Sequence, residues 1–234
     1  MSYRMVRKKL RSLANSETAV ILQRFFKTGS GQYGEGDKFL GIKVPQLRKV
    51  AKEFQDLKLS DVQKLLHSSN HEERLLAIIF LVNRFSTADE KTQERVYQLY
   101  LKNTRYINNW DLVDLSAHHI VGAYLFSRAK KLLYALAVSN DLWERRIAML
   151  STFYYIKRSR FQEALKISKI LLYDEHDLIH KAVGWMLREI GKRDLAVEED
   201  FLKSHYKKMP RTMLRYAIER FPESKRKRYL VGTI

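Results

Sequence analysis

The sequence contains no cysteine, three prolines and nine glycines among its 234 residues. Without cysteine, neither disulfides, thiolate catalysis nor cysteine-based zinc sites are available to the protein. The longest uninterrupted apolar run extends only from Leu75 to Val82, far short of the roughly 20 residues that a membrane-spanning helix needs. The basic N-terminus lacks the continuous apolar core of a secretory signal peptide. We therefore expect a soluble cytoplasmic protein that does not enter a membrane.

Signals for β-strands are also nearly absent. Alternating runs of β-branched residues are few, and no Asn-Gly or Asp-Gly pair marks a hairpin turn. The composition is nonetheless that of a folded protein, because 45% of the residues are hydrophobic and 12% are aromatic. We therefore predict an all-α fold in which a single domain extends over residues 1–234, a length sufficient to bury a core.

Positive charge is in large excess. The chain has 44 Lys and Arg residues against 26 Asp and Glu residues, which gives a formal net charge of +18. A field of this size favours a polyanionic partner, either nucleic acid or an anionic membrane surface. Interfaces with other proteins would leave much of this charge unpaired, which disfavours a scaffold for protein partners.

The N-terminal part contains two predicted helices and a Gly-rich loop. A basic helical segment is followed by a second helix, with Ser16 as its predicted N-cap, that extends through Phe26. The stretch Gly29–Gly36 then contains a literal Gly-x-Gly-x-x-Gly motif. A dinucleotide site requires a strand before this motif and a helix directly after it, and neither is present here. We interpret residues 29–36 as a flexible loop after a basic helical N-terminus at residues 1–28.

From about residue 38 the chain shows a helical repeat. Apolar residues at the centres of alternate predicted helices are separated by 36, 35, 35 and 34 residues; they are Ala77, Val113, Ala148, Val183 and Ala217. A period near 35 residues with two helices per unit is typical of an α-solenoid, in which each unit buries its apolar face against its neighbours. The intervening helices, such as Glu94–Leu101 and Phe161–Leu172, are expected on the convex side. The repeats end near residue 221, and a basic tail follows at residues 222–234.

One predicted helix carries a large aromatic residue and a carboxylate away from its apolar stripe. Trp110 and Asp114 are four residues apart, so on a helix they lie one above the other. Leu112 and Val113 begin an apolar stripe that assigns the opposite side of the same helix to the core. We therefore expect both Trp110 and Asp114 to face solvent.

The repeat register places further polar residues on the same side of the later helices. Counted from the repeat centres, Arg146 and Trp185 fall on the side away from the core positions, as Trp110 and Asp114 do. Stacked helices would bring two indoles, a carboxylate and a guanidinium onto one solvent-facing wall. Positive charge is expected to continue this wall at Lys181, Arg188 and Arg215.

Five motifs follow one another along the chain: Phe39–Lys49, the Trp110 to Asp114 spacing, Trp143–Arg146, Lys181–Glu189 and Arg211–Tyr216. In order and spacing they resemble the motifs of the AlkD-type DNA alkylation repair glycosylases, within a similarity that extends from Tyr33 to Phe221. The resemblance implies a right-handed α-α superhelix of HEAT-like repeats with a concave basic face. It also implies hydrolysis of the N-glycosidic bond of cationic N3- and N7-alkylated purines in double-stranded DNA, without a metal or an organic cofactor.

The resemblance also implies roles for individual residues. Trp110, Trp185 and Asp114 would surround the deoxyribose of the lesion, and an arginine would hold the DNA backbone. Two arginines stand in that motif, and the spacing from the repeat centre selects Arg146 rather than Arg145. We expect further contacts to DNA from Arg145, Lys181, Arg188, Arg215, Arg211, Lys43, Arg48 and Tyr33.

The chemistry of such a lesion suits these residue types. Alkylation at N3 or N7 makes the purine cationic, so it is a good leaving group without protonation by a general acid. Positive charge then develops on the sugar as an oxocarbenium ion, which a fixed carboxylate such as Asp114 would stabilise. Tryptophan faces attract cations by roughly 0.5 to 2 kcal/mol each, so Trp110 and Trp185 would favour a charged lesion over a neutral base.

Other patterns in the sequence are weaker. His67 with His71 and His176 with His180 have helical spacing, but no His-Glu-x-x-His motif and no third ligand accompanies them, so we predict no metal site. No lysine is placed for Schiff-base chemistry, so base removal without strand cleavage is expected.

Trp143 follows Asp141, a possible helix cap, and is interpreted as packing between repeats. The alternative function is that of a catalytically silent protein of the same fold that binds unusual DNA structures. The joint presence of Trp110, Asp114 and the predicted arginine and second tryptophan favours the glycosylase. We expect a monomer that associates with the nucleoid when bound to DNA.

Overall fold

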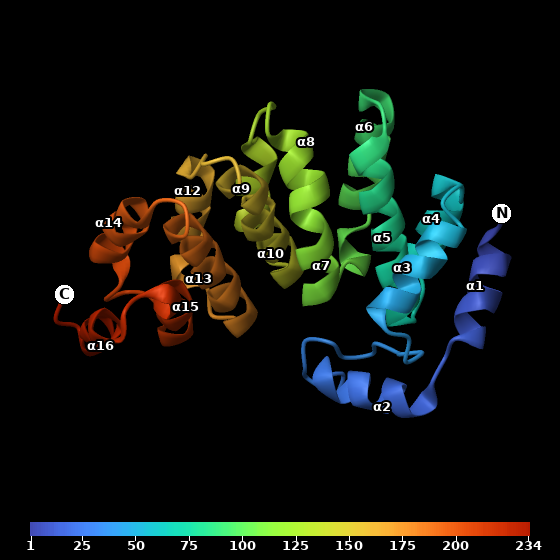
Figure 1. Ribbon diagram of the computed structural model, residues 1–234, viewed down its shortest axis with the longest axis horizontal. Coiled ribbons are helices and arrows are strands. Elements are labelled where there is room, and N and C mark those ends of the chain that lie inside the picture. Colours follow the sequence, from blue (N-terminus) through green and yellow to red (C-terminus); the bar gives the residue numbers. More distant parts are fainter. The chain divides into compact units, whose positions relative to one another are not determined.

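A computed structural model describes residues 1–234 and consists of helices without any strand, as predicted; a single isolated bridge joins Lys38 to Asn70. Figure 1 shows the order of the helices along the chain. The chain forms two compact units, Met1–Ile120 and Val121–Ile234. The expectation of one domain over the whole chain stays a prediction. None of the helices combines the length and the apolar character that a membrane-spanning segment requires.

Unit 1 is built around its longest helix, α5. Four other helices, α3, α4, α6 and α7, pack against α5, while α1 packs against α3 and α4. The helices of this unit are α1 (Tyr3–Ser12), α2 (Ser16–Phe25), α3 (Val44–Glu53), α4 (Leu59–Leu66), α5 (His71–Thr87), α6 (Glu90–Leu101), the 3-10 helix η1 (Thr104–Tyr106) and α7 (Trp110–Ala117). A π-helical turn, η2 (His118–Gly122), follows α7 and contains the boundary between the units.

Unit 2 is built around α13, which packs against α10, α11, α12, α14 and α15. Its helices are α8 (Ala123–Leu125), α9 (Lys131–Ala137), α10 (Leu142–Ser151), α11 (Phe153–Ile156), α12 (Gln162–Ile170), η3 (Leu171–Tyr173), α13 (Asp177–Gly191), α14 (Leu195–His205), α15 (Arg211–Ala217), η4 (Ile218–Arg220) and α16 (Glu223–Val231). Asp141 caps α10, as predicted, by accepting hydrogen bonds from the amides of Trp143 and Glu144.

Burial confirms the predicted repeat register. The five repeat centres lie on α5, α7, α10, α13 and α15, and none is accessible to solvent; they are Ala77, Val113, Ala148, Val183 and Ala217. The residue before each centre is buried as well, except Tyr216, which is 36% exposed. The two intervening helices predicted from sequence correspond to α6 and to α12 with η3. The chain therefore has an all-α helical repeat fold.

The two N-terminal helices are held in different ways. α1 buries Val6 and Leu10, whereas α2 buries none of its residues. Asn15, and not the predicted Ser16, is the N-cap of α2, since its side chain accepts a hydrogen bond from the amide of Thr18 at 2.8 Å. Ser16 is already helical, while the backbone of Asn15 is extended, as an N-cap requires. Sequence patterns often misplace a helix start by one residue in this way.

The Gly-rich segment at residues 29–36 forms the predicted loop, without a flanking strand. A side chain at Gly34 would collide with the backbone, because its Cβ would lie 2.4 Å from the carbonyl oxygen of Phe26. This close approach folds the loop back onto the end of α2, and the amide of Gly34 donates to the carbonyl of Lys27. The glycines therefore serve the backbone geometry of a turn.

One buried carboxylate anchors the segment after this loop. The amides of Leu40 and Gly41 each donate to Glu72 at 2.8 Å, and that of Ile42 donates at 3.2 Å. Gly41 has a φ of 80°, and a Cβ there would lie 2.0 Å from the carbonyl oxygen of Asn15. Leu40–Ile42 is thus fixed to the start of α5 by hydrogen bonds that no other residue at position 41 would permit.

The basic segment predicted as a C-terminal tail forms α16, which packs onto unit 2. Tyr229 is 1% exposed, and its ring contacts the edges of Tyr206 and Phe221 at 5.4 and 5.7 Å. Lys225 forms an ion pair with Glu199. Tyr229 is the one buried residue among the charged side chains of α16, so the sequence gives little sign that this segment packs as a helix.

Candidate active site

α7 begins at Trp110 and carries Asp114 one turn later. Asn109 is its N-cap, and the Asn109 Oδ1 atom accepts a hydrogen bond from the amide of Trp110 at 2.8 Å. Leu112 and Val113 are fully buried, whereas Trp110 and Asp114 are partly exposed. The predicted division of this helix into a core side and an outward side is therefore confirmed.

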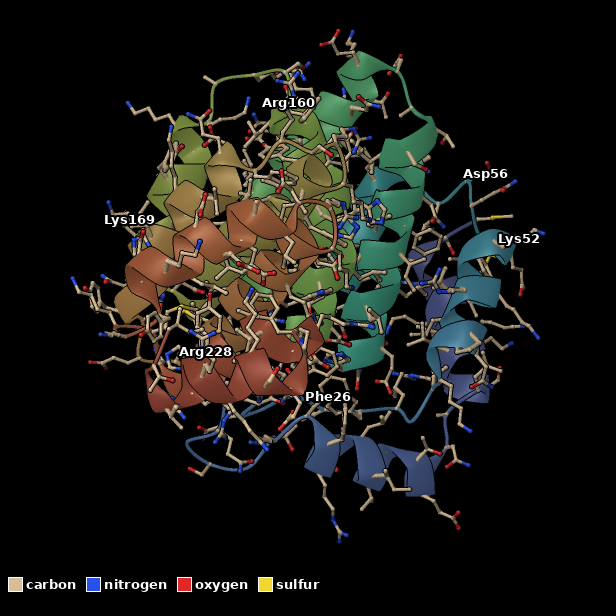
Figure 2. All side chains as sticks on the ribbon, turned by 60° about the vertical axis from the view of Figure 1, so that its left-hand side comes forward. Phe26, Lys52, Asp56, Arg160, Lys169 and Arg228 are labelled. Carbon is tan, nitrogen blue, oxygen red and sulfur yellow. The ribbon has the colours of Figure 1, made fainter.

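The Trp110 indole belongs to an aromatic cluster. Phe26 stacks on it with ring centroids 5.3 Å apart, and Phe25 meets it edge-on at 5.9 Å. Phe26 also stacks on Phe39, at 5.1 Å, and lies 4.9 Å from the ring of His71. Figure 2 shows Phe26 at the end of α2, where the chain enters the loop. Trp110 is thus outward-facing but not isolated, since one face of its indole is covered by a ring from another segment.

A buried charged network adjoins the aromatic cluster. His71, the first residue of α5, has both ring nitrogens next to carboxylates: Nδ1 lies 3.1 Å from Asp37 Oδ2, and Nε2 lies 2.8 Å from Asp111 Oδ2. Arg74 donates to the other oxygen of Asp37 at 2.6 Å. Asn109 donates to Asp37 at 3.3 Å. The network therefore joins Asp37, which directly follows the Gly-rich loop, to α5 and the first turn of α7.

The pKa values of this network reflect its pairing. Burial lowers the pKa of His71, but the charge of Asp111 and the hydrogen bonds to Asp111 and Asp37 outweigh burial and raise that pKa to about 9. Burial acts to raise the pKa of Asp37, yet the hydrogen bond from His71 and the charge of Arg74 hold it below its usual value. At neutral pH the network thus contains two cations and two carboxylates, and its net charge is zero.

In unit 2, Trp185 lies in the middle of α13. It is partly exposed, its ring centroid lies 5.8 Å from that of Phe153 on α11, and its side chain is hydrogen-bonded to Glu189 one turn later. Gly184 faces a different neighbour: a Cβ there would lie 2.4 Å from the carbonyl oxygen of Met213 on α15. Gly184 therefore permits close helix packing, while Trp185 occupies a separate, accessible side of α13.

Two cations neutralise Glu189, which is itself buried. Lys192 forms an ion pair with one carboxylate oxygen, and Arg193 lies 3.1 Å from the other. Burial acts to raise the pKa of Glu189, but these hydrogen bonds and the one from Trp185 lower it. The charge of Glu189 is consequently satisfied within its own helix and the residues that follow.

Arg145 is engaged in a local structural role. Its Nε lies 2.6 Å from Asp174, and its guanidinium donates to the backbone carbonyls of Ser139 and Asn140 at 2.9 and 3.0 Å. These contacts attach the loop before α10 to the loop before α13. A contact between Arg145 and DNA stays a prediction.

Arg146 departs from the prediction that its side chain faces solvent. It is only 4% exposed, and its guanidinium donates to the backbone carbonyl of Leu178 in the first turn of α13. Its position is next to Ile147, at the edge of the apolar stripe of α10, where packing against α13 covers it. The long aliphatic part of an arginine permits such burial while the guanidinium finds a polar partner.

The remaining predicted DNA contacts fall into two groups. Lys181 lies 2.7 Å from Asp177, and Arg188 forms an ion pair with Glu219, so part of the expected positive charge is neutralised. The other basic side chains are exposed, and the predicted tyrosine is partly exposed; they are Lys43, Arg48, Arg211, Arg215 and Tyr33.

The histidine pairs noted in the sequence have separate partners. His67 Nε2 lies 2.5 Å from Asn103 Oδ1, and the His67 ring stacks on Tyr106, whereas His71 belongs to the charged network. No group of three or more His, Asp or Glu side chains is arranged to hold a metal ion.

The charged network and Glu189 were not recognised from the sequence. Asp111 directly follows Trp110, and Asp37 precedes the Phe39–Lys49 motif, but nothing in their spacing connects them to each other. Their shared partner, His71, is 34 residues from Asp37 and 40 from Asp111. The one local signal was the spacing of Trp185 and Glu189, which repeats that of Trp110 and Asp114.

Comparison with known proteins adds an independent finding. The model of the family described as "DNA alkylation repair enzyme" matches residues 6–221. The chain belongs to this family. The matched residues include Trp110, Asp114, Arg146 and Trp185 and end before α16. Membership of the DNA alkylation repair enzyme family implies that DNA is the partner of the protein.

A solved structure supports the fold. The structure named "Predicted DNA alkylation repair enzyme from Enterococcus faecalis" is similar with a TM-score of 0.69 and 17% sequence identity, over 90% of this chain and 97% of that chain. At this level of identity the similarity shows the fold alone. No curated protein matches the sequence.

Proposed function

We propose that the protein is a monofunctional DNA glycosylase that releases cationic N3- and N7-alkylated purines from duplex DNA as the first step of base excision repair. Family membership supports a role in alkylation repair. The observation that carries the proposal is the pair on α7: a partly exposed indole at Trp110 and a partly exposed carboxylate at Asp114, one helical turn apart. These are the groups that a cationic sugar–base bond requires.

Asp114 would act on the sugar in the transition state. The bond between C1′ and the base nitrogen breaks with its electron pair leaving on the base, which becomes neutral, and positive charge develops on the sugar ring. The Asp114 carboxylate stabilises this charge and orients the water whose oxygen bonds to C1′. That water then loses a proton, and Asp114 can accept it. No nucleophilic side chain and no metal ion are needed for this balance.

The two tryptophans would favour the charged lesion over an ordinary base. A cation over an indole face gains roughly 0.5 to 2 kcal/mol, whereas a neutral purine gains only packing. Trp110 has one face occupied by Phe26, so its remaining surface is the part available to DNA. Trp185 is held by Glu189 and remains partly exposed.

Arg146 would position the DNA backbone. The resemblance assigns this role to it, although only 4% of the residue is exposed, and the bond to the Leu178 carbonyl restricts rotation of its guanidinium. A phosphate bound by a restricted guanidinium is held in a defined register, which positions the sugar for the reaction. We also propose that the protein acts as a monomer in the cytoplasm, on nucleoid DNA.

Release of free base distinguishes the proposed glycosylase from a catalytically silent protein that binds DNA structures. Purified protein is incubated, in excess, with duplex DNA that contains one N7-methylguanine, and free N7-methylguanine is measured by mass spectrometry, with Asp114→Asn as the comparison. We expect base release by the parent protein, no strand cleavage, and much slower release by the variant. Binding of the duplex without any base release would instead support the alternative, a silent protein that binds DNA structures.

A further inference from the structure

The first turn of α7 is attached to a single buried pair on both sides of Trp110. Asn109, which precedes Trp110, donates to Asp37 at 3.3 Å. Asp111, which follows Trp110, lies 2.8 Å from His71 Nε2. Asp37 and His71 are themselves bonded to each other at 3.1 Å. The backbone on either side of the indole is therefore fixed to the same Asp37–His71 pair.

The geometry requires a doubly protonated His71 ring. A neutral imidazole has one N–H group and one acceptor nitrogen, but here both nitrogens face carboxylate oxygens. Only an imidazolium can donate to Asp37 and to Asp111 at the same time. The other charged group facing this ring is Arg74, which is bonded to the second oxygen of Asp37. The raised pKa of His71 agrees with this protonation state.

Ring contacts extend the same restraint to the Trp110 side chain. The His71 ring stacks on Phe39 at 4.6 Å and lies 4.9 Å from Phe26, and Phe26 stacks on Trp110 at 5.3 Å. A change in the position of His71 would therefore reach Trp110 by two routes, through the backbone of α7 and through Phe26.

We infer that His71 is a positioning residue of the proposed site: as an imidazolium bridging Asp37 and Asp111, it fixes the first turn of α7 and thereby the placement of Trp110 and Asp114 against the lesion. The inference rests on the proposed glycosylase function. Buried ion pairs are often no more stabilising than apolar residues of the same volume, so such a network is better explained by the specific geometry that it imposes. An apolar core would pack α7 without defining its rotation.

His71→Gln tests the inference. Glutamine carries both of its N–H donors on one nitrogen, which cannot replace the two separate ring nitrogens of His71, so one carboxylate loses its donor and the bridge between Asp37 and Asp111 is broken. We expect the single-turnover rate of N7-methylguanine release to fall by about 10- to 100-fold, because displacement of reacting groups by about 1 Å can cost 100-fold. The dissociation constant for DNA should change by no more than about twofold, since His71 is buried.

A second variant separates positioning from loss of folding. In His71→Gln/Asp111→Asn, the amide at 71 can donate to Asp37 and accept from the amide at 111, which rebuilds the bridge without charge. We expect this double variant to recover a release rate within about fivefold of the parent. Such a recovery requires coupling between positions 71 and 111, because the effects of two independent substitutions would add. Asp111→Asn alone provides a third test if His71→Gln does not fold.

The matched control is His67→Gln. His67 lies in the same unit, donates one hydrogen bond to Asn103 Oδ1 and stacks on Tyr106, and neither contact involves α7. We expect a parent-like rate for this variant. A loss of rate in His67→Gln equal to that in His71→Gln would overturn the inference, because general destabilisation of unit 1 would then explain both.

A spectroscopic measurement tests positioning independently of activity. In the background Trp143→Phe/Trp185→Phe, Trp110 is the only tryptophan, and its fluorescence quenching by acrylamide reports its exposure. Quenching should increase in His71→Gln and return toward the parent value in the double variant. If the parent protein releases no base, the proposed function has failed, yet this measurement still decides whether His71 fixes Trp110. Unchanged quenching together with an unchanged release rate in folded His71→Gln would refute the inference.

Discussion

Two helices of the protein each carry a tryptophan and an acidic residue at the same spacing, but the surroundings of the two pairs differ. Trp110 and Asp114 on α7, and Trp185 and Glu189 on α13, are each separated by four residues, or one helical turn. Asp114 is partly exposed, whereas Glu189 is buried and bonded to Trp185, Lys192 and Arg193. An identical spacing thus produces a candidate catalytic carboxylate in one unit and a structural anchor in the other.

The two tryptophans also differ in the sequence separation of the residues that hold them in place. Trp185 is held largely by its own helix, through Glu189, and by Phe153 from α11. Trp110 stands at the start of its helix, where it is held by Phe26, 84 positions away, and by the charged network, in which Asn109 and Asp37 are 72 positions apart. A side chain in mid-helix can be positioned by its neighbours one turn away, while one at a helix start requires contacts from elsewhere in the fold.

The largest expected effect distinguishes the two carboxylates. Asp114→Asn should lower single-turnover base release by about 100- to 1000-fold, because it removes charge at the developing oxocarbenium ion while the size of the side chain is kept. Glu189→Gln should lower it by less than about 10-fold, since its oxygen still accepts from Trp185 and the lost charge is already paired. Both rates are measured at saturating protein, with folding compared by thermal melting. Equal losses in the two variants would remove the proposed distinction.

The pH dependence of stability should separate the two units. The contribution of His71 to the free energy of unfolding is fully present below its ordinary pKa of 6.5 and is lost as the pH rises through about 9, a change of about 3 kcal/mol. In unit 2, burial and the charge of Glu199 raise the pKa of Glu198 from 4.5 to about 8, so the contribution of the neutral acid is present below pH 4.5 and is lost as the pH rises through 8.

Urea unfolding between pH 4.5 and pH 9.5 measures both contributions. His71→Gln should flatten the decline between pH 6.5 and pH 9, and Glu198→Gln should flatten the decline that ends near pH 8 and stabilise the protein at pH 8. A parent protein whose stability is constant over this range would contradict both assignments.

The aromatic neighbours of the two tryptophans should contribute unequally to the stability of the protein. Phe26 is buried between Trp110 and Phe39, whereas Phe153 is partly exposed beside Trp185. Phe26→Leu should destabilise the protein by about 1 kcal/mol through lost ring contacts, and Phe153→Leu should cost less. Thermal melting of the two variants checks this order, and a larger cost for Phe153→Leu would reverse the comparison.

The smallest effects concern single phosphate contacts. Arg48 in unit 1 and Arg215 in unit 2 are exposed, while Arg188 is paired with Glu219. If Arg48 and Arg215 each neutralise one phosphate, replacement by Gln should reduce the slope of log affinity against log salt by about 0.9 and weaken binding only a few-fold. Arg188→Gln should change the slope less. Fluorescence anisotropy with labelled duplex DNA over a range of salt concentrations measures all three, and a parent slope near zero would exclude a polyanionic partner.

Much of the fold could be predicted from the sequence because the relevant physics is local. The apolar centres of the repeats, from Ala77 to Ala217, were found by periodicity and are buried. The outward placement of Trp110 and Asp114 follows from 3.6 residues per turn and needs no tertiary contact. Asn15 and Ser16 are both residue types that favour the N-cap position, and the predicted N-cap of α2 was wrong by one residue.

The sequence by itself therefore determined the helices of the repeats, their buried stripes and the partial exposure of the two tryptophans, since each depends mainly on residues within one or two helical turns. Only the tertiary structure decided that Arg146 is buried against α13, that residues 223–231 dock as a helix, and that Asp37, His71 and Asp111 form one charged network. The reason is physical: hydrogen bonds and ion pairs between distant segments carry no period along the chain, and their partners become neighbours only when the helices have packed.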